Sequence, residues 1–184
     1  MKAFKNVSES QINMSLLMTP SHSNFSGKIH GGYILNLMDE IAFACASKHS
    51  GNYCVTASVN RVDFLNPVDV GELLHLKASI NYTGTTSMVV GLRVEAENIR
   101  TGEIKHCNSS YFTMVAKDDD GKSVRVPGLI LDTEESIRRY SRSMERQKQS
   151  RIRQKSFNPE VFEVEDYFNE LDGCNVDITF KPEN

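Results

Sequence analysis

Residues 33–49, YILNLMDEIAFACASKH, constrain the fold most, because this segment is apolar nearly all round and contains neither Gly nor Pro. A helix of this kind is buried within a fold. The segment therefore predicts one long central helix that other elements must cover. Its apolar residues are Ile34, Leu35, Leu37, Met38, Ile41, Ala42, Phe43 and Cys45.

Strand-like runs stand on both sides of this helix. One precedes it at residues 11–18, and four follow it, at residues 54–65, 72–83, 86–98 and 104–116. Turn signals separate the last four, and connections this short force neighbouring strands to be antiparallel. A single sheet paired with one long helix must curve around that helix. The predicted fold class is α+β: an antiparallel sheet wrapped around a central helix, with a helical extension at the C-terminus.

The charge pattern predicts a core at residues 1–129 and a charged extension at residues 130–184. A basic helix is expected over residues 132–155, because an acidic first turn and basic later turns match the helix dipole. An acidic tail follows at residues 157–184. The basic face would bind nucleic acid or coenzyme phosphates, or it would be a solvated face of a helix that docks on its own core. The second interpretation is favoured, because no aromatic residues interleave the basic ones. No nucleic-acid partner is therefore predicted.

Cysteine usage and hydropathy point to the cytoplasm. The four cysteines are scattered without a CxxC pair, which favours reduced thiols, and no zinc-ligand spacing occurs. We therefore predict no metal. The N-terminus lacks the pattern of a secretory signal, and no run approaches the roughly 20 apolar residues of a membrane helix. A cytoplasmic protein without a membrane partner is expected.

Asp39 is the residue most informative about function. It lies between Met38 and Ile41 inside the predicted central helix. An ionised carboxylate in apolar surroundings is unfavourable without a partner, and burial would raise its pKa into the range of a general base. The alternative is that Asp39 faces solvent beside Glu40 or caps a local group. Composition alone does not separate the two.

A glycine loop precedes the helix. His30 stands before Gly31 and Gly32 in SGKIHGGYIL, and paired glycines let backbone approach a ligand closely. Free N–H groups at a helix start stabilise an anion or a developing oxyanion. The loop and Asp39 together would suit hydrolysis of a thioester. The alternative for the glycines is a tight turn with close helix–strand packing.

The segment NFSGKIHGGYILNLMDEIAFACASKHSG resembles the signature of the hotdog-fold acyl-CoA thioesterases. Two later segments, TASVNRVDFLNPVDVGELLHLKASINYTGTTSMVVGLRVEAENIRTGE and SSYFTMVAKDDDGKSVRVP, also follow this family. The similarity covers about residues 10–130 and is greatest to the bacterial short acyl-CoA hydrolases and the mammalian brain-type cytosolic enzyme. It implies a hotdog fold and an acyl-CoA thioester hydrolase that is not a serine esterase and needs no cofactor besides the coenzyme A of its substrate.

The same resemblance assigns roles to individual residues. Asp39 would be the base or nucleophile, and Asn24, which is otherwise an ordinary Asx-turn residue, would position water or substrate. The amide of Gly32 would contribute to the oxyanion hole, with His30 as a positioning residue. Asp39 and Asn24 of one site would come from different protomers of a homodimer. The family further implies a hexamer built as a trimer of dimers.

Coenzyme A contacts are expected on the strand-end turn and two arginines. Thr85, Thr86 and Ser87 would donate to phosphate or pantetheine groups, and Arg61 and Arg93 would contact charge. The equally weighted alternative for the arginines is a salt bridge on the outer sheet face, to Asp63 and Glu95.

Two other functions stay open from the sequence. One is a hotdog hydratase or dehydratase acting on acyl thioesters through a His–carboxylate pair. The other is a non-enzymatic module that binds coenzyme A or a nucleotide. Acyl chain-length preference, and the choice between base and nucleophile for Asp39, are not decided by the sequence.

Overall fold

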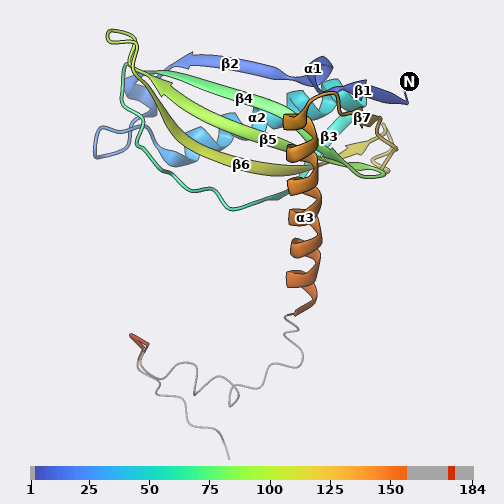
Figure 1. Ribbon diagram of the computed structural model, residues 1–184. Coiled ribbons are helices and arrows are strands. Elements are labelled where there is room, and N and C mark those ends of the chain that lie inside the picture. Colours follow the sequence, from blue (N-terminus) through green and yellow to red (C-terminus); the bar gives the residue numbers. More distant parts are fainter. Residues whose placement is uncertain (1–2, 157–173, 177–184) are drawn as a thin grey trace, which may run out of the picture. The chain divides into compact units, whose positions relative to one another are not determined.

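A curled antiparallel sheet around one helix forms the body of the protein, as the sequence predicts (Figure 1). The computed structural model describes residues 3–156 and 174–176. Its five-stranded sheet has the order β2-β4-β5-β6-β3, and every neighbouring pair is antiparallel. The strands are β2 (Ile12–Leu17), β3 (Tyr53–Val59), β4 (Leu73–Thr83), β5 (Ser87–Glu97) and β6 (Ile104–Lys117). The central helix α2 spans Gly31–Ser50 and lies against one face of the sheet.

The strand predicted at 54–65 is wrong in its second half. β3 ends at Val59. The Asn60 amide still donates to the Tyr111 carbonyl of β6 at 3.0 Å, but the Asn60 and Arg61 carbonyls accept from the Ser110 hydroxyl, at 3.2 and 3.4 Å. Four short elements were not predicted, since their contacts are to distant parts of the chain or span only a few residues. They are β1 (Phe4–Asn6), α1 (Val7–Ser10), the 3-10 turn η1 (Pro20–His22) and β7 (Gly128–Ile130), which pairs with β1 in parallel.

The core lies between α2 and the concave face of the sheet. Met38, Ala42 and Cys45 of α2 are fully buried there. The expectation that α2 is buried all round is wrong for one face, however, because Phe43 is 38% exposed and Asp39 and Glu40 are also exposed. The sheet packs on the apolar face of the helix and ends at the edge strand β3. This leaves a partly apolar helix face open beside that edge.

The predicted basic helix is present as α3 (Glu134–Ser156). Its first turns pack on the sheet: the centroids of the Tyr140 and Tyr82 rings are 5.1 Å apart, and Arg139 Nη1 donates to Ser79 Oγ at 3.3 Å.

By internal contacts the chain separates into Met1–Glu145 and Arg146–Asn184. The predicted domain boundary after residue 129 stays a prediction. The predicted acidic tail at 157–184 lies outside the described residues, apart from residues 174–176.

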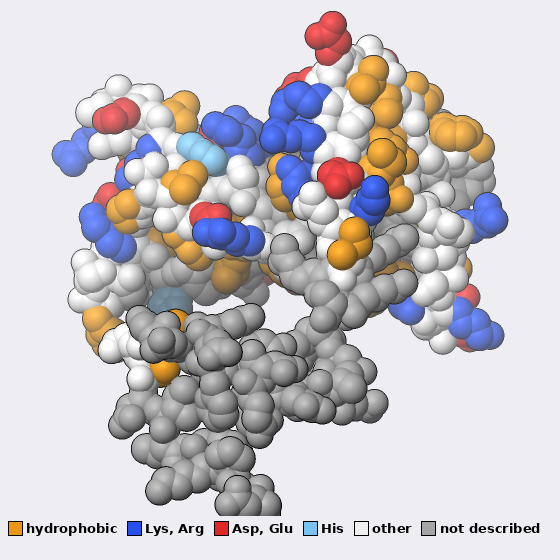
Figure 2. All heavy atoms as spheres, turned by 60° about the horizontal axis from the view of Figure 1, so that its bottom comes forward, with side chains coloured by type: hydrophobic (Ala, Val, Ile, Leu, Met, Phe, Trp, Pro, Cys, Tyr) orange, Lys and Arg blue, Asp and Glu red, His pale blue; other side chains and the backbone are white. Residues whose placement is uncertain are grey.

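Surface chemistry on the described part of the chain is mixed. On the face drawn in Figure 2, Lys and Arg side chains occur in separate groups between hydrophobic ones. No helix among the described residues is long and apolar enough to cross a membrane. The same residues contain no group of three or more His, Cys, Asp or Glu side chains placed to hold a metal ion.

A buried histidine ties the C-terminal end of α2 to two other segments. His49 is fully buried, its Nε2 lies 3.0 Å from the Pro127 carbonyl, and its Nδ1 lies 2.7 Å from Ser10 Oγ. A carbonyl only accepts, so Nε2 carries the proton and Nδ1 accepts from the serine. Burial, followed by a smaller effect of Lys5, holds the pKa of His49 below its usual 6.5.

We expect this histidine to make the fold less stable in mild acid. Because the folded-state pKa lies below the unfolded value, the unfolded chain binds a proton that the folded chain excludes once the pH falls below 6.5. Urea unfolding should therefore give a lower midpoint at about pH 5.5 than at about pH 7.5. A His49→Leu variant should lose about 1–3 kcal/mol, since two buried groups lose their partner. That variant should also lose most of the pH dependence, and an unchanged slope would contradict the assignment.

Candidate active site

Asp39 lies in an open pocket beside the sheet edge. The pocket has a volume of about 400 Å³ and lies between α2 and β3. Thr56 of β3 donates from Oγ1 to Asp39 Oδ1 at 2.6 Å, which fixes the carboxylate against the strand. Asp39 Oδ2 accepts no hydrogen bond from the described residues and is available to a ligand. Of the two alternatives that the sequence left open, the single chain shows the exposed one, because Asp39 stands on the open face of α2 beside Glu40.

The remaining walls of this pocket are mostly apolar. The rings of Phe43 and Tyr53 meet edge to face with centroids 5.5 Å apart, and both side chains are more than a third exposed. Glu40 also lines the pocket, but Asn36 Nδ2 donates to its Oε1 at 2.7 Å, one turn back on the helix. Asp39 is thus the acid held toward the strand, whereas Glu40 is held along the helix surface.

Cysteine thiols on the core face do not offer a competing nucleophile. Burial raises the pKa of the Cys45 thiol to about 12, and Lys48 opposes this only weakly. Burial also raises the pKa of Cys107. A reactive thiol needs the opposite shift.

The glycine loop forms the start of α2. His30 is the N-cap residue, and its Nδ1 accepts from the Gly32 amide at 3.0 Å. The Tyr33 and Ile34 amides both donate to the His30 carbonyl. The Gly31 amide, at the first helical position, donates to no acceptor among the described residues. Gly31 also packs under Phe64, since an added Cβ would lie 3.2 Å from the tip of that ring.

Asn24 closes the loop before the glycines. Its Oδ1 accepts from the amides of Ser26 and Lys28 at 2.9 and 3.2 Å and from the Ser26 hydroxyl at 2.7 Å. This is Asx-turn geometry. It uses only the oxygen of the side chain, so the Nδ2 donor of Asn24 is left for other partners.

An ion-pair cluster anchors this loop to the sheet. Lys28 pairs with Asp69, and Lys105 of β6 bonds both Asp69 at 3.2 Å and Glu72 at 2.8 Å. The hydrogen bond from Lys28, with a further one from Lys105, holds the pKa of Asp69 below its ordinary value. The Ile29 amide also donates to the Val68 carbonyl at 2.9 Å. The loop therefore has a fixed position relative to the sheet.

Within one chain, the two halves of the predicted site are apart. Asp39 follows His30 by nine residues of α2, which at 1.5 Å per residue is roughly 13 Å along the helix axis. Neither a His30–Asp39 pair nor a site joining Asp39 to the Gly31 amide therefore forms within a single chain. Asn24 and His30 lie in the same loop, joined by the β-bridge of Ser23 with Ile29.

The residues predicted to contact coenzyme A are not gathered in one place. Arg61 follows β3 and pairs with Asp63 at 2.8 Å, and Arg93 on the outer face of the sheet pairs with Glu95 at 2.7 Å. These are the salt bridges weighed as the alternative. Thr85, Thr86 and Ser87 form the β4–β5 turn; Ser87 is six residues from Arg93 on β5, roughly 20 Å along the strand.

Thr56 was missed by the sequence analysis. A threonine in a strand of alternating character is ordinary, and nothing in its spacing from Asp39 suggests a contact. The contact arises because β3 runs antiparallel to β6 at the edge of the sheet and passes the third turn of α2, which carries Asp39. Only a prediction of the strand order would have found it.

The curled sheet, the single helix and the carboxylate at the sheet edge define the class of hotdog-fold enzymes. The family described as the thioesterase superfamily matches residues 26–103. Protein VdlD of Helicobacter pylori is 46% identical over 133 residues, covering 72% of this chain and 76% of that protein. The acyl-CoA thioester hydrolase YkhA of Bacillus subtilis is 32% identical over 147 residues, covering 80% of this chain and 86% of that protein. The chain belongs to the thioesterase superfamily, among its acyl-CoA thioester hydrolases.

Solved structures agree with this assignment. A hexameric acyl-CoA thioesterase in its apo form is 37% identical with a TM-score of 0.80, covering 83% of this chain and 97% of that one. The acyl-CoA hydrolase of Staphylococcus aureus, solved with butyryl coenzyme A, coenzyme A and coenzyme A disulfide, is 34% identical with a TM-score of 0.76, covering 83% and 95%. Both similarities extend over nearly the whole of the solved chains.

Proposed function

We propose that the protein hydrolyses the thioester bond of acyl-CoA, releasing a free fatty acid and coenzyme A, with Asp39 as its catalytic carboxylate. The observation that carries this proposal is the Asp39 carboxylate held by Thr56 in an open, partly apolar pocket, with one oxygen unengaged. Such a group suits proton abstraction from water, or direct attack on an electrophilic carbonyl.

Variants of the Staphylococcus aureus enzyme support the choice of residues. Its structure has also been solved with one Asn, one Asp and one Thr each replaced by Ala. The sequence intervals between those three positions equal the intervals from Asn24 to Asp39 and from Asp39 to Thr56. We take Thr56 as a residue that orients Asp39, and Asn24 as one that positions water or substrate through its unengaged Nδ2.

Hydrolysis then proceeds in one of two ways. In the first, Asp39 takes a proton from water, the hydroxide adds to the thioester carbon, and the C–S bond breaks as the thiolate leaves and is protonated. In the second, Asp39 attacks the carbonyl, the thiolate leaves, and water cleaves the resulting anhydride. Both consume one water and need no metal or redox cofactor.

The oxyanion in either route needs an N–H donor. The Gly32 amide was predicted for this role, but it donates to His30 Nδ1 in the structure. The Gly31 amide, at the helix start, donates to no acceptor in the described part of the chain, and it benefits from the positive end of the α2 dipole. We therefore assign Gly31 as the first donor, with Gly32 joining only if the His30 ring turns away.

A second copy of the chain completes the site in this proposal. β3 is an edge strand of the described sheet, and the apolar side chains of Phe43, Tyr53 and Val59 beside it are exposed. An exposed apolar edge strand favours pairing with another chain. Pairing of two β3 strands would bring the Asp39 pocket of one chain to the glycine loop of its partner. Assembly of such homodimers into a trimer of dimers is the further proposal.

Contacts to coenzyme A and the cellular location follow as proposals of the same kind. Thr85, Thr86 and Ser87 remain candidates for the phosphate or pantetheine part, as does Arg61.

A protein that acts on acyl-CoA and carries reduced thiols is proposed to work in the cytoplasm. Thiol release from acyl-CoAs between acetyl and palmitoyl would test the activity and give the chain-length preference, and absence of release from every member would refute it.

Replacing Asn24 by Asp should separate its two roles. The carboxylate keeps the oxygen that accepts from Ser26 and Lys28, but it loses the Nδ2 donor. We expect the melting temperature to stay near that of the wild type while kcat/KM falls about tenfold to hundredfold, the loss typical of one preorganised donor. Asn24→Ala is the control that should also destabilise the loop. Full activity in Asn24→Asp would show that Asn24 acts only as a loop cap.

A further inference from the structure

An aromatic side chain stands at the tip of the loop that precedes α2. Phe25 is the most exposed of the large apolar side chains in the described part of the chain, with a relative exposure of 113%. Single exposed apolar residues are common on protein surfaces, so exposure alone leads to no conclusion. The position of Phe25 is more informative, because it directly follows Asn24, a residue of the candidate site.

Hydrogen bonds fix the turn on both sides of this ring. The Asn24 amide donates to the Lys28 carbonyl at 2.7 Å, and the Gly27 amide donates to the Asn24 carbonyl at 3.0 Å. Asn24 Oδ1 accepts from the amides of Ser26 and Lys28. Gly27 has a φ of 77°, a conformation that favours glycine and closes the turn. The Cα–Cβ bond of Phe25 therefore has a fixed direction, and the full exposure of the ring shows that this direction is outward.

The Asp39 pocket offers an apolar surface to such a ring. Phe43 and Tyr53 line it with rings that meet edge to face, and Val55 lines it as well. Tyr53 is 63% exposed, so most of its surface is available to another group. Aromatic rings pack well on one another at such angles. A third ring at this place would cover apolar surface that the single chain leaves in water.

Charge also favours the approach of the loop to this pocket. Asp39 and Glu40 line the pocket, and no Lys or Arg among the described residues does. Residues 19–32, which carry Phe25, contain no acid and end at the positive start of the α2 dipole. Surfaces of opposite sign attract one another, so the loop of one chain and the pocket of another are complementary.

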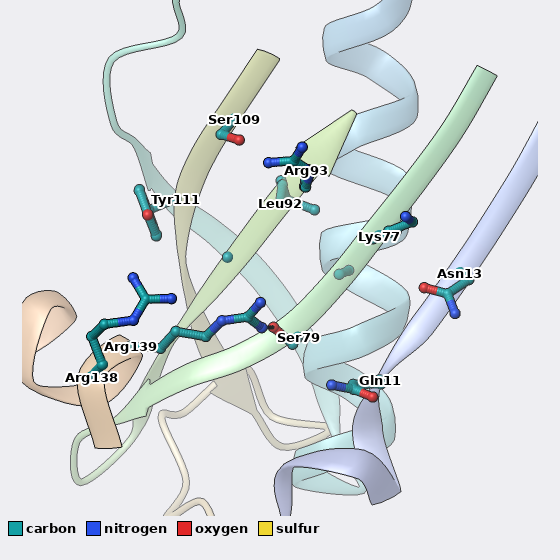
Figure 3. Close-up of a pocket in the computed structure, with 12 residues that line it drawn as sticks. Gln11, Asn13, Lys77, Ser79, Leu92, Arg93, Ser109, Tyr111, Arg138 and Arg139 are labelled. Carbon is teal, nitrogen blue, oxygen red and sulfur yellow. Dashed lines mark hydrogen bonds between the residues drawn. The ribbon is translucent and has the colours of Figure 1, made fainter. Parts of the chain in front are cut away.

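The pocket on the outer face of the sheet, with a volume of about 310 Å³, does not suit the same loop. Lys77 and Arg93 lie at one end of it, and Arg138 and Arg139 reach over the other end from α3 (Figure 3). No Asp or Glu in the described part of the chain lines it. These cations would repel the positive start of α2, so charge selects the Asp39 pocket as the receiver.

We propose that Phe25 of one chain enters the Asp39 pocket of its partner and limits the length of the acyl group that the site accepts. This inference rests on the proposed function, in which Asn24 of one chain acts beside the partner's Asp39. Neighbouring Cα atoms are about 3.8 Å apart, so an Asn24 amide beside that carboxylate brings the Phe25 ring to the rim of the same pocket.

The ring then forms a wall at which the acyl chain ends. Phe43 and Tyr53 form the apolar side of the pocket beside Asp39, and Phe25 packs against them from the other chain. The thioester carbon must lie at Asp39, so the methylene groups beyond it extend toward these rings. A short acyl chain fits in front of the Phe25 ring, whereas a long one has to displace it. Phe25 is therefore a specificity-determining residue and takes no part in the reaction itself.

Ring size at position 25 should shift the chain-length preference in opposite directions. We expect Phe25→Ala to raise the ratio of kcat/KM for palmitoyl-CoA to that for butyryl-CoA about tenfold, because the opened space accepts more methylene groups. Phe25→Trp should lower the same ratio, which a general loss of folding would not do. Ile99→Ala, in the β5–β6 turn, removes another exposed apolar side chain and should leave the ratio unchanged. An unchanged ratio in both Phe25 variants, or an equal shift in the Ile99 variant, overturns the proposal.

Photochemical cross-linking locates the ring without relying on hydrolysis. A benzophenone analogue of phenylalanine in place of Phe25 should give a covalent dimer on irradiation, with the adduct mapped by mass spectrometry to residues 39–56 of the other chain. The same analogue in place of Ile99 should give no adduct there. Thiol release from acyl-CoA without this adduct refutes the role of Phe25 and leaves the proposed function standing. The adduct without thiol release from any acyl-CoA refutes the proposed function, and the specificity role is then refuted with it.

Discussion

Replacing Asp39 by Asn should lower kcat/KM for acyl-CoA hydrolysis by about three orders of magnitude, within the range expected for loss of a general base. The amide keeps an oxygen that can accept from Thr56 Oγ1, so the local structure should survive. What is lost is the carboxylate oxygen that would take a proton or attack the thioester. The fall should appear in kcat, with binding of free coenzyme A retained, because the variant removes a group used in the reaction and not in holding the ligand.

The neighbouring acid supplies a matched control. Glu40 lines the same pocket, but its carboxylate accepts from Asn36 along the helix. Glu40→Gln preserves that hydrogen bond and removes the same amount of charge as Asp39→Asn. We expect it to have a far smaller effect on thiol release. Comparable losses of kcat/KM in the two variants would mean that the reaction needs negative charge in the pocket but no specific carboxylate. The assignment of Asp39 as the catalytic residue would then be wrong.

The choice between base and nucleophile needs a different measurement. In a single turnover in water labelled with oxygen-18, the anhydride route with attack of water on the aspartyl carbonyl places label in the Asp39 carboxylate, so label found there identifies that route. In the general-base route the label appears only in the released acid. Mass spectrometry of the peptide that contains Asp39 reads the difference directly.

The sequence was sufficient for the main elements of the fold because their signals are local. The uninterrupted apolar run at 33–49 predicts α2, and alternation in 86–98 predicts β5 within a residue at each end. The 54–65 run was predicted too long, because the end of β3 depends on the Ser110 hydroxyl of another strand. Such a contact between residues distant in sequence leaves no periodic signal.

The site could be predicted only in part, for the same reason. The glycine loop and Asp39 lie on one continuous segment, so their sequence motif identifies both. The sequence left the exposure of Asp39 open, because an apolar helix surface has the same pattern whether it packs on its own sheet or lies open beside an edge strand. The contact with Thr56 depends on which strand ends at the sheet edge, and this is set by the order β6-β3.

The second large effect follows from the proposal that the open face of α2 packs against another chain. We expect that mixing two inactive variants recovers activity. If Asp39 of one chain works with the loop of its partner, a dimer of an Asp39→Asn chain and an Asn24→Asp chain contains one site with both defects and one intact site. Neither variant alone should have substantial activity. Refolding equal amounts together should restore about a quarter of the wild-type rate, because half of the dimers are mixed and half of their sites are intact.

The control for this experiment is a mixture of Asp39→Asn with a chain that carries both substitutions. Every Asp39 position in that mixture is altered, so no pairing yields an intact site and no recovery is expected. Refolded wild-type chain measures the yield of the procedure. If the first mixture stays as inactive as this control while the wild type recovers, each site is complete within one chain. The roughly 13 Å between the start of α2 and Asp39 would then have to be spanned by some movement of the helix or the loop. Recovery near one quarter, in contrast, follows only if the carboxylate and the loop that act on one thioester belong to different chains, as the roughly 13 Å along α2 and the edge position of β3 lead us to propose.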